Sequence, residues 1–177
     1  MLQISFSSEI RPVGGSLAIL VPQGETRPAV FTELDTALSG ALSRAAKAEG
    51  FSGKDGTSCV VLAPSAAFER IVLVGLGKAE AVDAFVAEKA GGLASSLLGR
   101  AEKAAVATGD LSGALAAHVA LGATLGAYHF GLYHGAPEAL DNHKLQALSV
   151  LSAHAADADS AWPSLQAVAR GDRKSTL

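Results

Sequence analysis

The sequence predicts an α/β fold, a three-layer α/β/α sandwich in which helices cover both faces of a mixed sheet. Two observations predict it. Short apolar runs typical of buried strands alternate along the chain with segments whose apolar residues recur every three or four positions. The chain also has 177 residues, of which 49% are hydrophobic and 18% charged, so it can bury a sizeable core and is not a disordered chain.

Two strands are predicted at the N-terminal end. Leu2–Phe6 alternates apolar and polar side chains, which indicates a half-buried strand. Leu17–Val21 is an unbroken apolar run that ends at Pro22, which indicates a strand buried on both faces.

The period then changes to that of a helix. Apolar residues recur at spacings of three and four over Phe31–Lys47, so we expect one amphipathic helix there. Thr32 and Asp35 have the spacing of a capping box, and Gly50 would end the helix. The turn-rich sequence FSGKDG follows.

The middle of the chain predicts two strands and a helix. The strands are Ser58–Ala63 and Ile71–Val74, and the link between them is too short for a helical crossover, so we expect an antiparallel pair. The helical period returns over Ala79–Leu98, although Gly91 and Gly92 inside this segment weaken the case for an unbroken helix.

The last third predicts a strand, a helix, a second strand and a second helix. Their expected limits are Lys103–Thr108, Asp110 (as the N-cap) to Tyr133, Leu145–Leu151 and Asp157–Arg170. We therefore expect one domain over residues 1–170 and a polar, mobile tail over 171–177.

Composition excludes several functions. There are 14 Lys and Arg against 17 Asp and Glu, a formal charge of −3, and no basic cluster that would bind nucleic acid. The most apolar long stretch, Ala114–Tyr128, is mostly Ala and Gly and is too weakly apolar to span a membrane. The N-terminus lacks the features of a secretory signal, so we expect a cytoplasmic protein.

The sequence GLGK at 75–78 is the weak candidate for a ligand-binding turn. It follows a predicted strand and opens a predicted helix, a setting that binds phosphate groups in α/β folds. The dinucleotide fingerprint fails, however, because Glu80 stands where its third glycine belongs, and the P-loop pattern fails as well. Two interpretations stay open: Gly75, Gly77 and Lys78 contact a ligand, or the glycines only allow a tight turn.

No motif in the sequence assembles a metal centre or a catalytic nucleophile. The histidines lack the spacing of zinc ligands, and His129 and His134 are expected to lie at a helix end or on the surface. Asp157 and Asp159 are expected to be solvated at a helix start. Cys59, the one cysteine, has apolar neighbours and is expected to be an inert core thiol, and no intrachain disulfide is possible.

Small residues recur at a spacing of four in one predicted helix. The pairs are Gly122 with Gly126 and Gly131 with Gly135. In lipid such spacing is typical of helix dimers. In this Ala-rich helix we expect it to allow close approach to the sheet.

Four segments, in this order and spacing, resemble the N-terminal domain of the leucyl aminopeptidase family. They cover nearly the whole chain. In the third of these segments, Ala120–Tyr133, His129 and Gly131 replace the basic and acidic residues often seen in the family. The segments are Phe31–Gly56 with its FSGKDG loop, Glu69–Lys78 (ERIVLVGLGK), Ala120–Tyr133 (ALGATLGAYHFGLY) and the final helix ending at Ala169-Arg170-Gly171.

The resemblance implies a macro-domain-like α/β/α sandwich that is not itself catalytic. In the family, a larger C-terminal domain holds two divalent metals, zinc or manganese, that activate water for removal of N-terminal residues from peptides. The signature NTDAEGRL of that domain has no counterpart in this chain, so the resemblance assigns no catalytic residue and no metal ligand here. A fragment or a truncated homologue is expected.

Two roles follow from the resemblance. The first is a structural or regulatory domain whose partners are the catalytic domain and the subunits of the family's hexamer. The alternative is a stand-alone module that binds a nucleotide or ADP-ribose near Gly75–Lys78. Some family members bind DNA through this domain, but the charge of −3 argues against that here.

Overall fold

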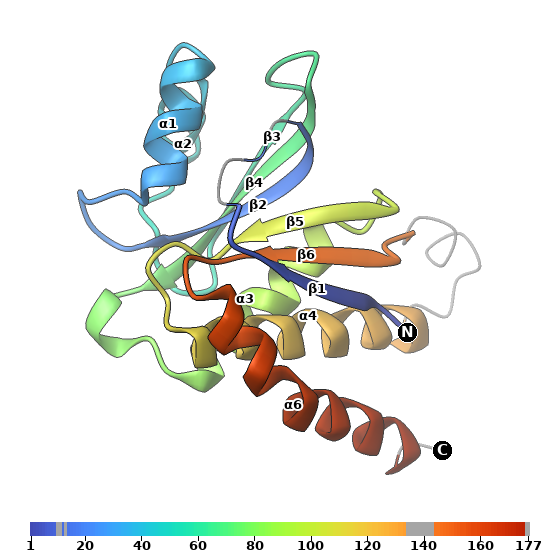
Figure 1. Cartoon of the computed structure of the whole chain (residues 1–177). Helices are drawn as coiled ribbons and strands as arrows, with labels where there is room; N and C mark the ends of the chain where they lie inside the picture. Colours follow the sequence, from blue (N-terminus) through green and yellow to red (C-terminus); the bar gives the residue numbers. More distant parts are fainter. Residues whose placement is uncertain (10–11, 13, 134–143, 176–177) are drawn as a thin grey trace.

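A single twisted sheet runs through the molecule in the strand order β1-β6-β5-β2-β4-β3 (Figure 1). The computed structural model describes all residues except 10–11, 13, 134–143 and 176–177. Neighbouring strands pair in parallel, apart from β3 and β4, which are antiparallel as the short link predicts. Within the described residues the strands are β1 (Gln3–Ser7), β2 (Gly15–Pro22), β3 (Ser58–Leu62), β4 (Phe68–Gly77), β5 (Lys103–Ala107) and β6 (Ala147–Leu151).

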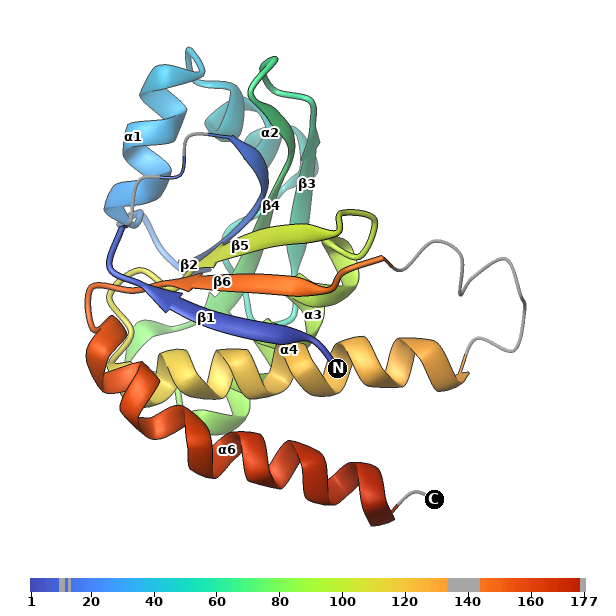
Figure 2. The same cartoon turned by 45° about the vertical axis from the view of Figure 1, so that its right-hand side comes forward.

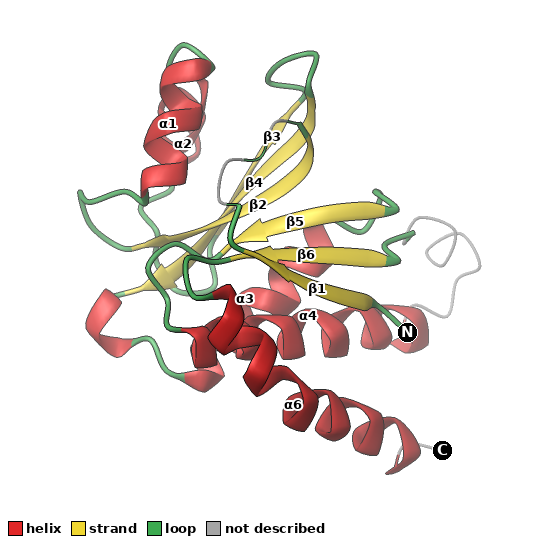
Figure 3. Ribbon diagram, viewed as in Figure 1, coloured by secondary structure: helices red, strands yellow, loops and turns green. Residues whose placement is uncertain are grey.

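Helices cover both faces of this sheet, which confirms the three-layer sandwich. On one face lie α1 (Ala29–Ala37) and α2 (Ala41–Glu49). On the other lie α3 (Ala84–Leu97), α4 (Gly113–Tyr133) and α6 (Ala155–Ser175), as Figures 2 and 3 show. Successive side chains of β2 point to opposite faces, and its central run is fully buried, as expected for Leu17–Val21.

The helix expected over Phe31–Lys47 is two helices. The chain turns between them at Ser39 and Gly40, both of which have positive φ (56° and 79°). Asp35 does not form a capping box with Thr32. Its carboxylate instead accepts hydrogen bonds from the backbone N–H (3.0 Å) and the hydroxyl of Ser43, in the first turn of α2. The expected end at Gly50 is confirmed by its left-handed backbone.

Removing the Asp35 carboxylate is expected to destabilise the chain by about 1 kcal/mol, because the backbone N–H and the hydroxyl of Ser43 at the start of α2 lose their acceptor. Urea unfolding of Asp35→Ala followed by circular dichroism measures this. Asp35→Asn keeps an acceptor oxygen and should unfold close to the unsubstituted chain. Equal losses of stability in Asp35→Ala and Asp35→Asn would show that the negative charge of Asp35, and not its capping hydrogen bond, stabilises the chain.

The strand expected at Ile71–Val74 is longer than predicted and includes Gly75 and Gly77. β4 runs on to Gly77, so the GLGK sequence does not open a helix. A short 3-10 turn, Ala79–Ala81, follows, and α3 begins at Ala84, where the Asp83 carboxylate accepts from the N–H of Val86 at 2.9 Å. The prediction of a helix that begins at Ala79 is therefore wrong, because the helix begins at Ala84.

Two other helix limits differ from those expected. The N-cap of α4 is Ser112, whose hydroxyl accepts from the N–H of Leu115 at 3.3 Å, and not Asp110. The last helix contains Asp157 in its first turn, as expected, but extends beyond Arg170 to Ser175.

Gly122 and Gly126 of α4 face α3 and not the sheet. A methyl group added at Gly122 would overlap the backbone carbonyl of Glu88, and one at Gly91 would overlap that of Val119. The helices therefore cross with their backbones in contact, and Gly91 and Gly92 lie inside an unbroken α3. Gly135, of the second glycine pair, lies outside the described residues.

Candidate functional site

Gly75 and Gly77 are held by the loop that precedes β3. The N–H of Gly75 donates to the carbonyl oxygen of Thr57 at 2.8 Å, and the N–H of Gly77 donates to that of Gly53 at 2.9 Å. A methyl group on Gly75 would overlap the carbonyl oxygen of Lys54. Both N–H groups that a phosphate would need are thus already bonded within the chain, which supports the interpretation of these glycines as packing residues.

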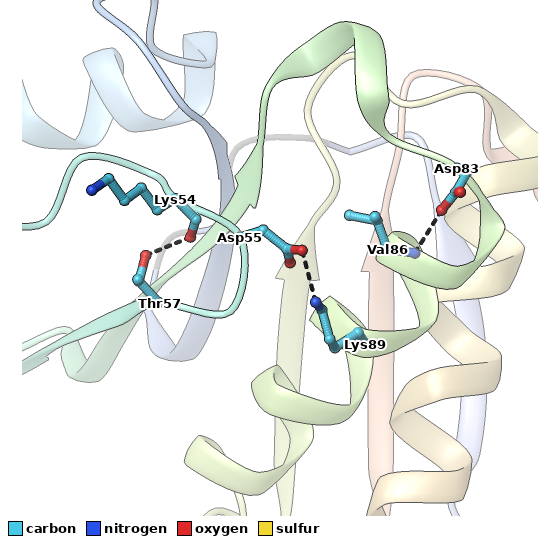
Figure 4. A network of polar contacts seen from close by, with 6 residues as sticks. All are labelled: Lys54, Asp55, Thr57, Asp83, Val86 and Lys89. Carbon is cyan, nitrogen blue, oxygen red and sulfur yellow. Dashed lines mark hydrogen bonds and ion pairs between the residues drawn. The ribbon is translucent and has the colours of Figure 1, made fainter.

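The same loop is tied to α3. The Lys89 ammonium lies 2.7 Å from the Asp55 carboxylate, and the Thr57 hydroxyl donates to the carbonyl of Lys54. Figure 4 marks both contacts. The Lys54 ammonium points away from these contacts. Because the Lys89 and Asp55 side chains are 43% and 40% exposed, solvent screens the pair, which positions the loop more than it stabilises the fold.

A cavity of about 560 Å³ opens where β2, β4 and β5 end. After β2 the chain goes to α1 on one face, and after β4 and β5 it goes to α3 and α4 on the other, so the connections diverge above the strand ends. Of the three weak candidates for ligand binding, Lys78 lines this cavity, whereas Gly75 and Gly77 do not. Its lining consists of Leu20, Pro22–Pro28, Leu76, Lys78–Glu80, Val82 and Thr108–Leu111.

Arg27 is a lining residue that the sequence analysis missed. It lies in the loop after β2, with its guanidinium carbon 5.4 Å from the centre of the Phe31 ring. Its Nη1 atom is buried and has no hydrogen-bond partner in the part of the chain that the structure describes. The sequence signal was a cation in the loop after a buried strand, which no motif marks.

Cys59 and His118 do not line this cavity. Cys59 is 3% exposed, and burial, followed by the charge of Glu49, raises the pKa of its thiol, which agrees with an inert core residue. His118 lies on α4 with its Nδ1 2.7 Å from a carboxylate oxygen of Glu88 on α3, a pair that spacing did not predict. The side chain of His129 and the whole of His134 are outside the described residues.

The described residues do not fit a two-metal centre. Among them there is no group of three or more His, Cys, Asp or Glu side chains that could hold a metal ion. In the same part of the chain, no helix has the length and apolar character needed to cross a membrane.

Residues 19–137 match the model of the cytosol aminopeptidase family, N-terminal domain. This match covers more than half of the chain. The chain belongs to the cytosol aminopeptidase family. The resemblance drawn from the four sequence segments is thereby confirmed.

Relatives in this family are much longer than the chain. A probable cytosol aminopeptidase of Sinorhizobium fredii is 34% identical over 177 residues, which are 96% of this chain and 35% of the relative. One of Gluconobacter oxydans is 37% identical over 84% of this chain and 30% of the relative. The chain therefore spans about a third of the length of these cytosol aminopeptidases and corresponds to their N-terminal domain.

Solved structures show the same fold. A mutant of tomato leucine aminopeptidase matches with a TM-score of 0.79 and 24% identity, over 97% of this chain and 36% of that one. The bottromycin maturation enzyme BotP in complex with Mn matches with a TM-score of 0.59 and 20% identity, over 89% of this chain and 30% of that one.

Proposed function

We propose that this N-terminal domain is not catalytic and serves a cytosol aminopeptidase as a structural and regulatory domain. The observation that carries the proposal is the match of residues 19–137 to the family's N-terminal domain in a chain that spans 35% of a relative's length. The parent protein would remove N-terminal residues from peptides in the cytoplasm, which agrees with the relatives' name, cytosol aminopeptidase.

The metals and partners of the parent follow from the same proposal. Two divalent ions, zinc or manganese, would be bound by the catalytic domain, where they supply a polarised carbonyl and an activated water. This chain would pack beside that domain and contribute to a hexamer. Nucleic acid is not a proposed partner, because the formal charge is −3 and no basic cluster attracts phosphates.

Hydrolysis of leucine p-nitroanilide tests the absence of catalysis. We expect the purified 177-residue chain to release no nitroaniline above the background of a mock purification, with or without manganese. The full-length relative from Sinorhizobium fredii, purified in parallel, is the positive control. Activity that co-elutes with the chain and falls with the folded fraction in the Gly122→Ala variant would contradict the proposal.

A chimera tests the structural role. In it, this chain replaces the matching N-terminal third of the Sinorhizobium fredii relative, to which it is 34% identical. We expect the chimera to keep the relative's oligomeric mass and its hydrolysis, and the relative without its N-terminal third to lose its assembly. A truncated relative that assembles and acts like the intact one would refute a structural role.

A further inference from the structure

We propose that the cavity at the ends of β2, β4 and β5 binds a small organic molecule that carries one anionic group, a carboxylate or a phosphate, and an apolar body. Arg27 would bind the anionic group, with Lys78 at the rim. This inference goes beyond the proposed function and does not rest on it.

The position of the cavity is the first argument. In open α/β sheets, ligands bind outside the carboxyl ends of parallel strands where neighbouring connections go to opposite faces. Here β2 lies between its parallel neighbours β4 and β5, and the chain leaves β2 toward α1 but leaves the other two toward α3 and α4. A volume of about 560 Å³ is within the range of small-molecule sites.

Arg27 is the second and independent argument. A buried guanidinium nitrogen without an acceptor is unfavourable, and such groups in native proteins call for an explanation. The guanidinium lies over the Phe31 ring, which supplies no acceptor oxygen. A small adjustment would let a carboxylate or phosphate oxygen entering the cavity accept from Nη1, and the planar fork of arginine suits both groups.

The rest of the lining decides what else the ligand carries. Leu20 and Leu76 are buried at the base, and Val82 and Leu111 are partly buried, which suits an apolar body. The rim also carries three exposed carboxylates, which would repel a ligand with several negative charges. The lining therefore favours a single anionic group over a diphosphate. These carboxylates are those of Glu25, Glu80 and Asp110.

Titrations of the full 177-residue chain test the site. The probes are N-acetyl-leucine for a carboxylate, AMP for a monophosphate and ADP-ribose for a diphosphate, followed by calorimetry and amide NMR. We expect saturable binding of N-acetyl-leucine or AMP, with shifts at Leu76, Val82 and Gly109, and weaker binding of ADP-ribose. The better of the first two probes identifies the anionic group.

Two substitutions connect binding to the proposed residues. Arg27→Met should weaken binding at least about tenfold, because a charge-assisted hydrogen bond is lost. Lys78→Gln should weaken it by a smaller factor. Lys54→Gln removes another exposed lysine, one that does not line the cavity, and is the matched control. Should Arg27→Met fail to fold, Ala79→Trp at an exposed lining position blocks the cavity instead and should abolish binding.

Several results would overturn the proposal. One is the absence of cavity shifts with every probe at about 10 mM, a concentration that reveals even weak sites. Others are unchanged affinity in a folded Arg27→Met or Ala79→Trp variant, equal losses in the Lys78 and Lys54 variants, or tighter binding of ADP-ribose than of AMP and N-acetyl-leucine.

Discussion

Gly122→Ala is expected to lower the free energy of unfolding by about 3 kcal/mol or more, enough to leave part of the chain unfolded. The added methyl would overlap the carbonyl oxygen, carbonyl carbon and Cα of Glu88, all of them backbone atoms. Backbone atoms cannot rotate aside as a side chain can, so α3 and α4 must separate. The separation would also strain the contact between His118 and Glu88 at the same crossing.

Gly171→Ala is the matched control for this prediction. Gly171 also lies in a helix, α6, but a methyl group there meets nothing within 4 Å. Alanine is the better helix former, so this variant should gain about 0.5–1 kcal/mol. Urea unfolding followed by circular dichroism compares the two. If both variants shift the midpoint in the same direction, the helix crossing is not as tight as the contacts indicate.

The sequence was sufficient to predict the six strands and the three layers because buried strands carry unbroken apolar runs and a half-buried strand alternates apolar and polar residues. Leu17–Val21 is such a run, and its residues are fully buried in β2. The division between α1 and α2 was not predictable from periodicity. Phe31 and Leu34 of α1 and Leu42 of α2 belong to one apolar cluster on one face of the sheet, so their spacing continues across the turn at Gly40.

The candidate site was less predictable, because it depends on contacts between distant segments. A glycine in an apolar strand is consistent with an open turn or with close approach of another backbone, and Gly75 proved to be the second case through its contact with Lys54. Arg27 became a candidate only when the ends of three strands and the Phe31 ring were seen around it. Lys78 was a candidate from the sequence because it belongs to the GLGK turn that follows the strand predicted at Ile71–Val74.

Gly75→Ala is expected to cost about 3 kcal/mol, although it lies in a strand, where alanine is normally tolerated. The methyl would overlap the carbonyl oxygen of Lys54 and crowd the hydroxyl of Thr57 and the backbone of Gly53. The loop would have to lift from β4, and the hydrogen bonds that Gly75 and Gly77 donate to it would lengthen or break. Urea unfolding measures the loss, and faster amide hydrogen exchange at Gly77 would place it at this loop.

Gly56→Ala separates crowding from backbone strain in the same loop. Gly56 has a φ of 77°, but a methyl group there meets nothing within 4 Å, so alanine should cost only about 1 kcal/mol, the price of a left-handed backbone. Hydrogen exchange at Gly77 should stay slow in this variant, because its bond to Gly53 is retained. Equal costs for the two substitutions, or fast exchange at Gly77 in both, would mean that the loop is held by its own turn geometry and not by its contact with β4. The larger cost at Gly75, with exchange affected only there, is what the close approach of the two backbones requires.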